Sequence, residues 1–265
     1  MSDGVSSYPR TAAISPRVEV LPFSASTNAE LVSGVIAAPG EWPHLGVLLT
    51  TDQRAGRGRR GRQWSAPAGT ALAISTLVRV ADIPAAARGW VPLLAGAAMA
   101  RAVAAQLRGS THTAGLKWPN DVLVDGAKIS GVLAEVVLGD PDSIVVGVGV
   151  NTLMARDELP VPSATSFAVL GVDCDDDALV ADYLAALNET LGALAAAAGD
   201  AGAAGIVGQV EALCTTLSRQ VAVSLPDESV LRGRAQRIAS DGCLVVVTSD
   251  GAETAVAAGD VVHVR

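Results

Sequence analysis

A β-hairpin is encoded most clearly in GLKWPNDVLVDGAKISGVLAE, residues 115–135. Two apolar runs flank the pair Asp125-Gly126, and this pair is a strong hairpin signal because both residues tolerate the positive φ of a tight turn. Pro119 fixes its own φ and has no amide hydrogen, so it ends the strand before it. The sequence therefore predicts strands over 122–124 and 128–138, joined by a turn at 125–126.

Further strands and helices are expected on both sides of this hairpin. Apolar runs and alternation predict strands over 18–23, 45–51, 70–80 and 143–150. Helices are expected from the capping residues 24–28 to about 36, over 84–107 with a break near Pro92, and over 163–170, 176–197 and 203–217. From residue 220 the chain changes to short strands separated by turn residues, which is typical of a small β-barrel. We therefore expect an α+β fold, with a disordered segment over 1–16, a mixed-sheet domain over 17–217 and a small barrel over 218–265.

Composition limits the class of protein. Half of the 265 residues are hydrophobic, so the chain can bury a substantial core. The formal net charge of −8 argues against a general binder of nucleic acids or anionic membranes. The three cysteines are far apart and form no C-x-x-C pair, which favours neither a disulfide framework nor a zinc site and suits a reducing cytosol. No signal peptide and no membrane span are predicted, so we expect a cytoplasmic protein.

A glycine- and arginine-rich segment, the arginine loop, covers residues 53–69. It has five arginines among the nine residues 54–62 and no acidic residue there. The loop contains G-x-G-x-x-G, but a dinucleotide fold needs a helix directly after the glycines, and here Trp64, Pro67 and Gly69 precede a strand. Glycines let the backbone approach a ligand closely and arginines supply charge and forked donors, so an anion-binding loop is one interpretation. Composition leaves a solvated basic loop open as the alternative.

The chain has two lysines, Lys117 and Lys128, and both lie within one twelve-residue window. Because arginine is the usual cation of this chain, a retained lysine indicates that a compact ammonium is needed. Asn120 and Asp121 follow Lys117 at a predicted strand end, and Asp121 is a candidate Mg²⁺ ligand. Asn151 ends a predicted strand, and its amide suits the edge of adenine. An Asx turn at 120–121 and a hairpin lysine that faces solvent are the alternatives.

Taken together, the motifs resemble those of one family, the biotin protein ligases. They are, in order, Ser26-Thr27-Asn28, Gln53, GRGRRGRQW at 56–64, KWPNDV at 117–122, KISGVLAE at 128–135 and GVGVNT at 147–152. The resemblance runs from about residue 18 to the C-terminus and implies a class II synthetase-like catalytic domain with a mixed sheet, followed by an SH3-like barrel. It also implies an ATP-dependent ligase that forms biotinyl-5′-AMP from biotin and ATP, and then transfers biotin to one lysine of a biotin carboxyl carrier domain.

The resemblance further implies roles for individual residues. Biotin would be bound by Ser26, Thr27, Asn28, Gln53, Arg57, Gly58, Arg59 and Lys128. ATP would be bound by Arg59, Arg62, Trp64, Lys117, Asn120, Asp121 and Asn151, with Trp64 stacking on adenine. Lys128 and Arg59 would be the catalytic residues, since their charges offset the repulsion between a carboxylate and ATP. Mg²⁺ would accompany ATP at Asp121, and no tightly bound metal is expected.

One departure from part of the family concerns the N-terminus. Many members carry a DNA-binding helix-turn-helix there, and the residues before Ser26 are too few for it. A ligase-only form without a nucleic-acid or membrane partner is therefore expected, as a monomer or a weak homodimer.

Three other functions fit parts of the sequence. A lipoate or octanoate ligase or transferase of related fold would share the domain, although the arginine loop and KWPND match the biotin branch. A nucleic-acid-binding module would use the arginine loop and the barrel, and its binding would depend on salt and not on ATP. A non-catalytic biotin-binding protein is disfavoured because no matched functional position is substituted.

Overall fold

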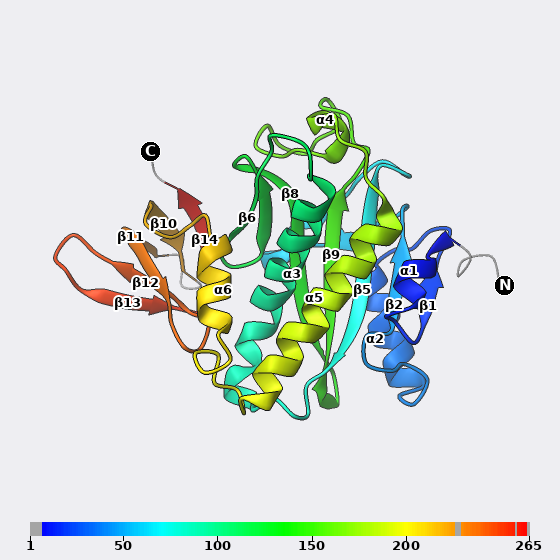
Figure 1. Cartoon of the computed structure of the whole chain (residues 1–265), viewed down its shortest axis with the longest axis horizontal. Coiled ribbons are helices and arrows are strands. Elements are labelled where there is room, and N and C mark those ends of the chain that lie inside the picture. Colours follow the sequence, from blue (N-terminus) through cyan, green and yellow to red (C-terminus); the bar gives the residue numbers. More distant parts are fainter. Residues whose placement is uncertain (1–6, 226–228, 258, 264–265) are drawn as a thin grey trace.

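A seven-stranded mixed sheet forms the centre of the molecule in the computed structural model, which describes residues 7–225, 229–257 and 259–263 (Figure 1). Its strands, in spatial order, are β1 (Val18–Val20), β2 (Val47–Thr50), β5 (Ala71–Arg79), β9 (Asp140–Asn151), β8 (Ala127–Val137), β7 (Asp121–Val124) and β6 (Ala114–Lys117). β1 and β2 are parallel because helix α2 (Thr27–Ala37) returns the chain between them. The other neighbouring pairs are antiparallel.

The predicted hairpin is confirmed and is formed by β7 and β8. Asp125 and Gly126 have φ values of 50° and 84°, as a type I′ turn requires. The register shifts after Val122, so that Asp121 pairs with Gly131 but Leu123 pairs with Lys128. Because residues two apart on a strand share a face, this extra residue in β8 brings Lys128 onto the same face as Asp121.

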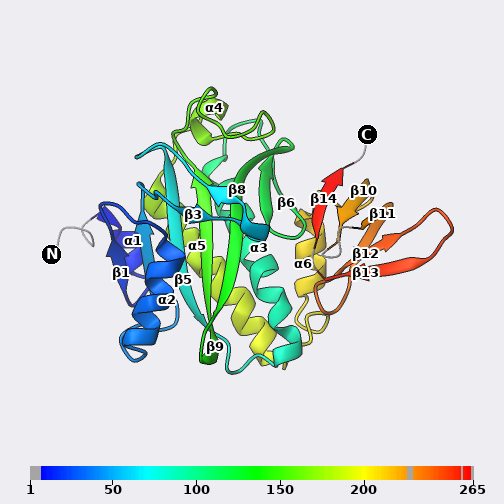
Figure 2. The ribbon, with the colours of Figure 1, turned by 180° about the vertical axis from the view of Figure 1, so that it is seen from behind.

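Helices cover both faces of the sheet. α3 (Val91–Gln106) and α5 (Asp176–Ala196) lie on one face and α2 lies on the other (Figures 1 and 2). The predicted break near Pro92 is confirmed, since a 3₁₀ segment over Ala85–Trp90 precedes α3 and Pro92 occupies its first turn, where no amide hydrogen is needed. The shorter helices are α4 (Phe167–Leu170) and α6 (Ile206–Leu213). Among the described residues, no helix combines the length and the apolar composition that crossing a membrane requires.

The C-terminal strands form a separate antiparallel sheet beside β6 and α6 (Figure 1). In spatial order they are β13 (Glu253–Val256), β12 (Leu244–Val247), β11 (Val230–Ile238), β10 (Gln220–Ser224) and β14 (Asp260–His263). The predicted run of short strands is confirmed, but the expected barrel is not closed in the structure: no ladder joins β13 to β14 within the described residues. Short connections make each sequential pair antiparallel, whereas closure needs a contact between the first and last edges that no local signal encodes.

One hydrophobic core continues from the large sheet into the C-terminal sheet. Val221, Val223 and Leu244 belong to the same buried cluster as Leu94 and Trp118. Two buried indoles add directed contacts, since Trp90 Nε1 donates to Ser240 O at 2.8 Å and Trp118 Nε1 donates to Gly242 O at 3.1 Å. The C-terminal sheet is therefore packed firmly against the large sheet and α3.

The N-terminal segment differs from the expectation of disorder over 1–16. Residues 1–6 lie outside the described residues, but Pro9–Ala12 form a short helix, α1. Thr11 is fully buried, and its amide and hydroxyl both donate to Asp177 Oδ1 at 2.8 Å. Composition alone indicated disorder because these partners are on α5, more than 160 residues away.

Candidate active site

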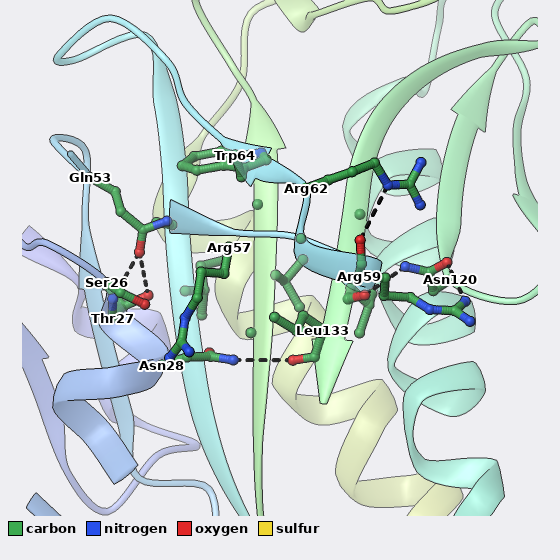
Figure 3. Close-up of a pocket in the computed structure, with 18 of the residues that line it drawn as sticks. Ser26, Thr27, Asn28, Gln53, Arg57, Arg59, Arg62, Trp64, Asn120 and Leu133 are labelled. Atoms are coloured by element: carbon green, nitrogen blue, oxygen red, sulfur yellow. Dashed lines mark hydrogen bonds between the residues drawn. The ribbon is translucent and has the colours of Figure 1, made fainter. Parts of the chain in front are cut away.

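A cavity lies between the start of α2, the arginine loop and strands β8 and β9 (Figure 3). These elements are on the face of the sheet opposite α3 and α5 (Figure 2). Twelve of the predicted site residues line it: Ser26, Thr27, Asn28, Gln53, Arg57, Gly58, Arg59, Arg62, Trp64, Asn120, Asp121 and Lys128. They come from four separate stretches of the sequence. The fold therefore gathers in one place what the sequence spreads over about a hundred residues.

The N-terminus of α2 supplies one side of the cavity. Ser26 is the N-cap of the helix, as its side-chain oxygen accepts from the Ala29 amide at 3.4 Å. The amide and hydroxyl of Thr27 donate to Gln53 Oε1 at 2.8 and 3.0 Å. These side chains are neutral and can each donate or accept a hydrogen bond, so this side suits a polar, uncharged group.

A partly buried network behind this side holds Asn28 in place. Asn28 Oδ1 lies 2.7 Å from Ser75 Oγ, and Nδ2 donates to Glu135 Oε2 at 2.8 Å and to Leu133 O at 3.3 Å (Figure 3). Glu135 Oε1 also lies 3.8 Å from a guanidinium nitrogen of Arg57, which joins the network to the arginine loop. Ser75 and Glu135 are positioning residues that the sequence reasoning did not single out.

Glycines on β9 bring the floor of the cavity close to the side chains above it. A Cβ at Gly147 would collide with the Asn28 amide, and a Cβ at Gly149 would stand 2.6 Å from the Trp64 indole. Residues two apart on a strand face the same side, so Gly147 and Gly149 clear one face together. The alternation GVGV was the available signal for this role.

The arginine loop is folded over the cavity instead of being irregular throughout. β3 (Gly56–Arg57) and β4 (Gln63–Trp64) form a two-stranded ribbon, with a 3₁₀ turn over Arg59–Gly61 between them. Arg59 Nη1 donates to Asn120 Oδ1 at 3.0 Å, and Arg62 Nε donates to Arg59 O at 3.3 Å (Figure 3). Arg59 and Arg62 thus lie at the other end of the cavity from Ser26 and Gln53.

A close ion pair connects the hairpin strands within the cavity. Lys128 Nζ lies 2.5 Å from Asp121 Oδ1, and both side chains retain some exposure to solvent. Asn120 beside them donates to Val132 O at 2.7 Å, which fixes its amide so that Oδ1 faces Arg59. An anion that enters this end would compete with Asp121 for Lys128.

Two predicted site residues do not line the cavity. Asn151 is buried at the end of β9, and its amide donates to Thr165 O at 2.9 Å. Lys117 ends β6 opposite Asp121, and the amide of the next residue, Trp118, donates to Thr216 Oγ1 at 3.0 Å, an atom that also lies 3.4 Å from His263 Nε2. Burial lowers the pKa of His263 first, and the charges of Lys117 and Arg219 lower it further. Lys117 therefore lies near the C-terminal sheet.

The described residues of the cavity form no preassembled metal site. Within the part of the chain that the structure describes, no three His, Cys, Asp or Glu side chains cluster as metal ligands. Asp121 is the carboxylate beside Lys128, and one carboxylate together with substrate phosphates is a common way to bind Mg²⁺.

Comparison with known proteins places the chain in a family. Residues 24–151 match the Biotin/lipoate A/B protein ligase family, and residues 216–264 match the Biotin protein ligase C terminal domain. The chain is 37% identical to the biotin--[acetyl-CoA-carboxylase] ligase of Mycobacterium tuberculosis, over 94% of this chain and 90% of that protein. It is also 34% identical to the bifunctional ligase/repressor BirA of Escherichia coli, over 66% of this chain and 53% of that protein.

Solved structures agree with these sequence matches. The biotin protein ligase of Aquifex aeolicus in complex with biotin and ATP has a TM-score of 0.74 and 25% identity, over 94% of this chain and 99% of that one. A biotin protein ligase of Leishmania major, at 23% identity and a TM-score of 0.60 over 92% of this chain and 99% of that one, shares the fold. The resemblance that the motifs indicated is confirmed: the chain belongs to the biotin protein ligase family.

Proposed function

We propose that this chain activates biotin with ATP, forming biotinyl-5′-AMP and pyrophosphate, and then transfers the biotinyl group to one lysine of a carboxylase biotin carrier domain. Family membership supports the proposal, as do the name of the Mycobacterium tuberculosis relative and the biotin and ATP in the Aquifex aeolicus structure. The observation that carries it is the division of the cavity into a neutral polar end and a cationic end (Figure 3).

The neutral end matches the head group of biotin. A ureido ring has one carbonyl acceptor and two N–H donors, and the hydroxyls of Ser26 and Thr27 and the amide of Gln53 can both donate and accept. Asn28, held by Ser75 and Glu135, completes this end. The backbone of Arg57, Gly58 and Arg59 would then lie along the acyl tail, which leads toward Lys128.

The cationic end suits the first reaction. A carboxylate oxygen of biotin attacks the α-phosphorus, a new P–O bond forms, and the bond to the leaving pyrophosphate breaks. Lys128 and Arg59 would stabilise the negative charge that concentrates around phosphorus. Arg62 and Trp64 would hold the nucleotide, Asn120 would orient Arg59, and Lys117 and Asn151 would serve the ATP site from outside the cavity.

Asp121 is suited to a second task when ATP is present. In the free chain it pairs with Lys128, and phosphate oxygens that take over Lys128 would leave the carboxylate available. Asp121 would then hold Mg²⁺, which neutralises phosphate charge. Asp121 would thus balance the charge of Lys128 before ATP binds and the charge of Mg²⁺ afterwards.

The second reaction needs no covalent bond to the enzyme. The amine of the carrier lysine attacks the carbonyl of the mixed anhydride, and AMP leaves. The arginine loop, which already lies over the cavity, would limit the access of water to this reactive compound. For the C-terminal sheet we propose an SH3-like barrel, and for the whole chain, whose described cysteines are all free thiols, a cytoplasmic location.

An intact-mass assay tests the proposal directly. The purified protein is incubated with Mg-ATP and a biotin carrier domain, with biotin or lipoate in parallel reactions. We expect a biotinyl mass shift on the carrier that is absent without ATP and with lipoate, and that is lost in Lys128→Gln. A lipoyl shift would move the substrate to the lipoate branch, and no shift with either acid would contradict the ligase function.

A further inference from the structure

Arg60 is next to Arg59 in the arginine loop but contacts a different part of the molecule. Its Nη1 and Nη2 donate to Ser224 O and Leu225 O, each at 3.3 Å, so the guanidinium bridges two successive carbonyls at the end of β10. Arg59 meanwhile donates to Asn120 in the cavity. Two adjacent side chains therefore bind the loop to two separate parts of the molecule, the large sheet and the C-terminal sheet.

The backbone conformation of Arg60 points to the importance of its side chain. Arg60 has φ 56° and ψ 38°, a left-handed conformation that residues with a Cβ rarely adopt. Glycine stands at positions 58 and 61 in the same turn, but not at position 60. If only a flexible backbone were required at this position, glycine would be the less strained choice. The contacts of the side chain explain why an arginine is found there.

The two acceptor carbonyls belong to a firmly held strand end. Val223 is fully buried, and Ser224 pairs with Val230 on one side and Asp260 on the other. The side chain of Leu225 packs against the main core. Because these carbonyls are fixed, a guanidinium bound to both of them restrains the loop with respect to the whole molecule. Hydrogen bonds from a charged donor are also stronger than neutral ones.

We propose that Arg60 is a positioning residue through which the C-terminal sheet holds the arginine loop over the cavity and slows the escape of biotinyl-AMP. Arg60 is not among the residues that line the cavity, so it acts on the reaction through the loop. The proposal rests on the proposed function. It also gives the C-terminal sheet a task in the first half of the reaction, before any carrier domain is bound.

Three substitutions at this position separate the side chain from the backbone. Arg60→Gly removes the contacts and relieves the backbone, Arg60→Ala removes the contacts and leaves the strain, and Arg60→Lys keeps the charge but not the fork. Arg54→Ala is the matched control, because Arg54 is an exposed arginine of the same loop that pairs with Asp52 outside the cavity. Biotinyl-AMP is formed from biotin and Mg-ATP in a single turnover, and its release is followed after rapid filtration.

We expect Arg60→Gly and Arg60→Ala to release biotinyl-AMP about tenfold faster than the parent, a change equivalent to about 1.4 kcal/mol. Arg60→Lys should be intermediate, Arg54→Ala unchanged, and the thermal midpoint of Arg60→Gly no lower than that of the parent. Release from Arg60→Gly at the parent rate would overturn the proposal, since position 60 would then matter only as backbone.

A second measurement needs neither biotin nor ATP. Amide hydrogen exchange over residues 57–62 should be faster in Arg60→Gly than in the parent and in Arg54→Ala. Unchanged exchange would show that Arg60 does not restrain the loop. If the parent forms no biotinyl-AMP, the proposed function fails, but the exchange comparison still decides the role of Arg60.

Discussion

Two side chains of the cavity, those of Trp64 and Asn28, have room to lie where they do because glycines are beneath them. Gly149 lies under the Trp64 indole and Gly147 lies under the Asn28 amide, two positions apart on the same face of β9. Trp64 is proposed to serve ATP and Asn28 to serve biotin. A substitution at each glycine can therefore test one half of the cavity without the other.

Gly149→Ala should weaken ATP binding selectively. The added methyl group would stand 2.6 Å from the indole, so Trp64 must shift away from the sheet. Overpacking of this kind costs about 1–3 kcal/mol, and we expect the KM for ATP to rise about tenfold or more while the KM for biotin changes less than about twofold. Steady-state kinetics of pyrophosphate release measures both. The control is Gly192→Ala on the exposed side of α5, where nothing lies within 4 Å. Equal effects on both substrates would contradict this assignment.

Asn28→Asp should destabilise the fold because it places a second carboxylate beside Glu135. The new carboxylate of this buried residue would face the half-buried Glu135, to which Asn28 now donates at 2.8 Å, and one donor would be lost. We expect the free energy of unfolding to fall by about 2–4 kcal/mol. Glu135→Gln should recover part of the loss in the double variant, because its amide can donate to the aspartate. Denaturant unfolding of the four proteins forms the cycle, and additive effects would argue against this contact.

The sequence made some cavity residues predictable and left others hidden. Lys128 and Asn120 are conspicuous because lysine and asparagine are rare in this chain, and Asp121 directly follows Asn120 at a predicted strand end. Ser75 and Glu135 carry no comparable signal, since each is one polar residue within a predicted strand. Their role depends on the sheet order, which sets β5 and β8 on either side of β9 beneath α2. Pairing between distant strands is not encoded locally.

Secondary-structure elements were predictable where local turn and cap chemistry is strong. The hairpin at 125–126, the cap at Ser26 and the break before Pro92 each follow from a few adjacent residues. Helix α1 and the β3–β4 ribbon were missed, because α1 depends on Asp177 and the ribbon on glycine-rich sequence that reads as loop. A small barrel was expected from the strand pattern and from the family resemblance, and the strand pattern does not determine which edges meet.

The hairpin has a pH-sensitive contact at its turn. His112 Nδ1 lies 2.6 Å from Asp125 Oδ2, and this hydrogen bond is the main cause that raises the pKa of His112 above its ordinary value. The same bond lowers the pKa of Asp125. Because the folded-state pKa of His112 is raised, the contact stabilises the folded protein fully at pH values below the ordinary histidine pKa. This stabilisation is lost as the pH rises through the folded-state pKa of His112. At the acid end it is lost as the pH falls through the lowered pKa of Asp125.

Asp125→Asn should bring the pKa of His112 down toward its ordinary value. Asn-Gly suits the same turn type as Asp-Gly, so the hairpin itself should persist. An NMR titration of the His112 imidazole, with unchanged signals from β7 and β8, measures both points. A His112 pKa that is the same in the two proteins would show that Asp125 is not the cause.

At the scale of the whole molecule, the C-terminal sheet is bound to the catalytic part by the turn between β11 and β12. The Trp90 and Trp118 indoles donate to Ser240 O and Gly242 O, and the Ile238 amide donates to Glu211 on α6 at 2.8 Å. Buried residues of both sheets belong to one cluster. Such a continuous core predicts that the two sheets unfold together.

Trp118→Phe tests this coupling. The substitution leaves the buried carbonyl of Gly242 without its donor and removes part of a fully buried ring, so we expect the free energy of unfolding to fall by about 2–4 kcal/mol. Amide exchange of β5, β8 and β9 reports the central sheet, and amide exchange of β10 to β12 reports the C-terminal sheet. Both probes should shift by the same amount in denaturant, because a contact shared by two cooperative parts stabilises both. If β10 to β12 lose protection at lower denaturant while the midpoint for β5, β8 and β9 stays unchanged, the C-terminal sheet is an independent unit. The hold that Arg60 exerts on the arginine loop would then vary with the folding of that unit.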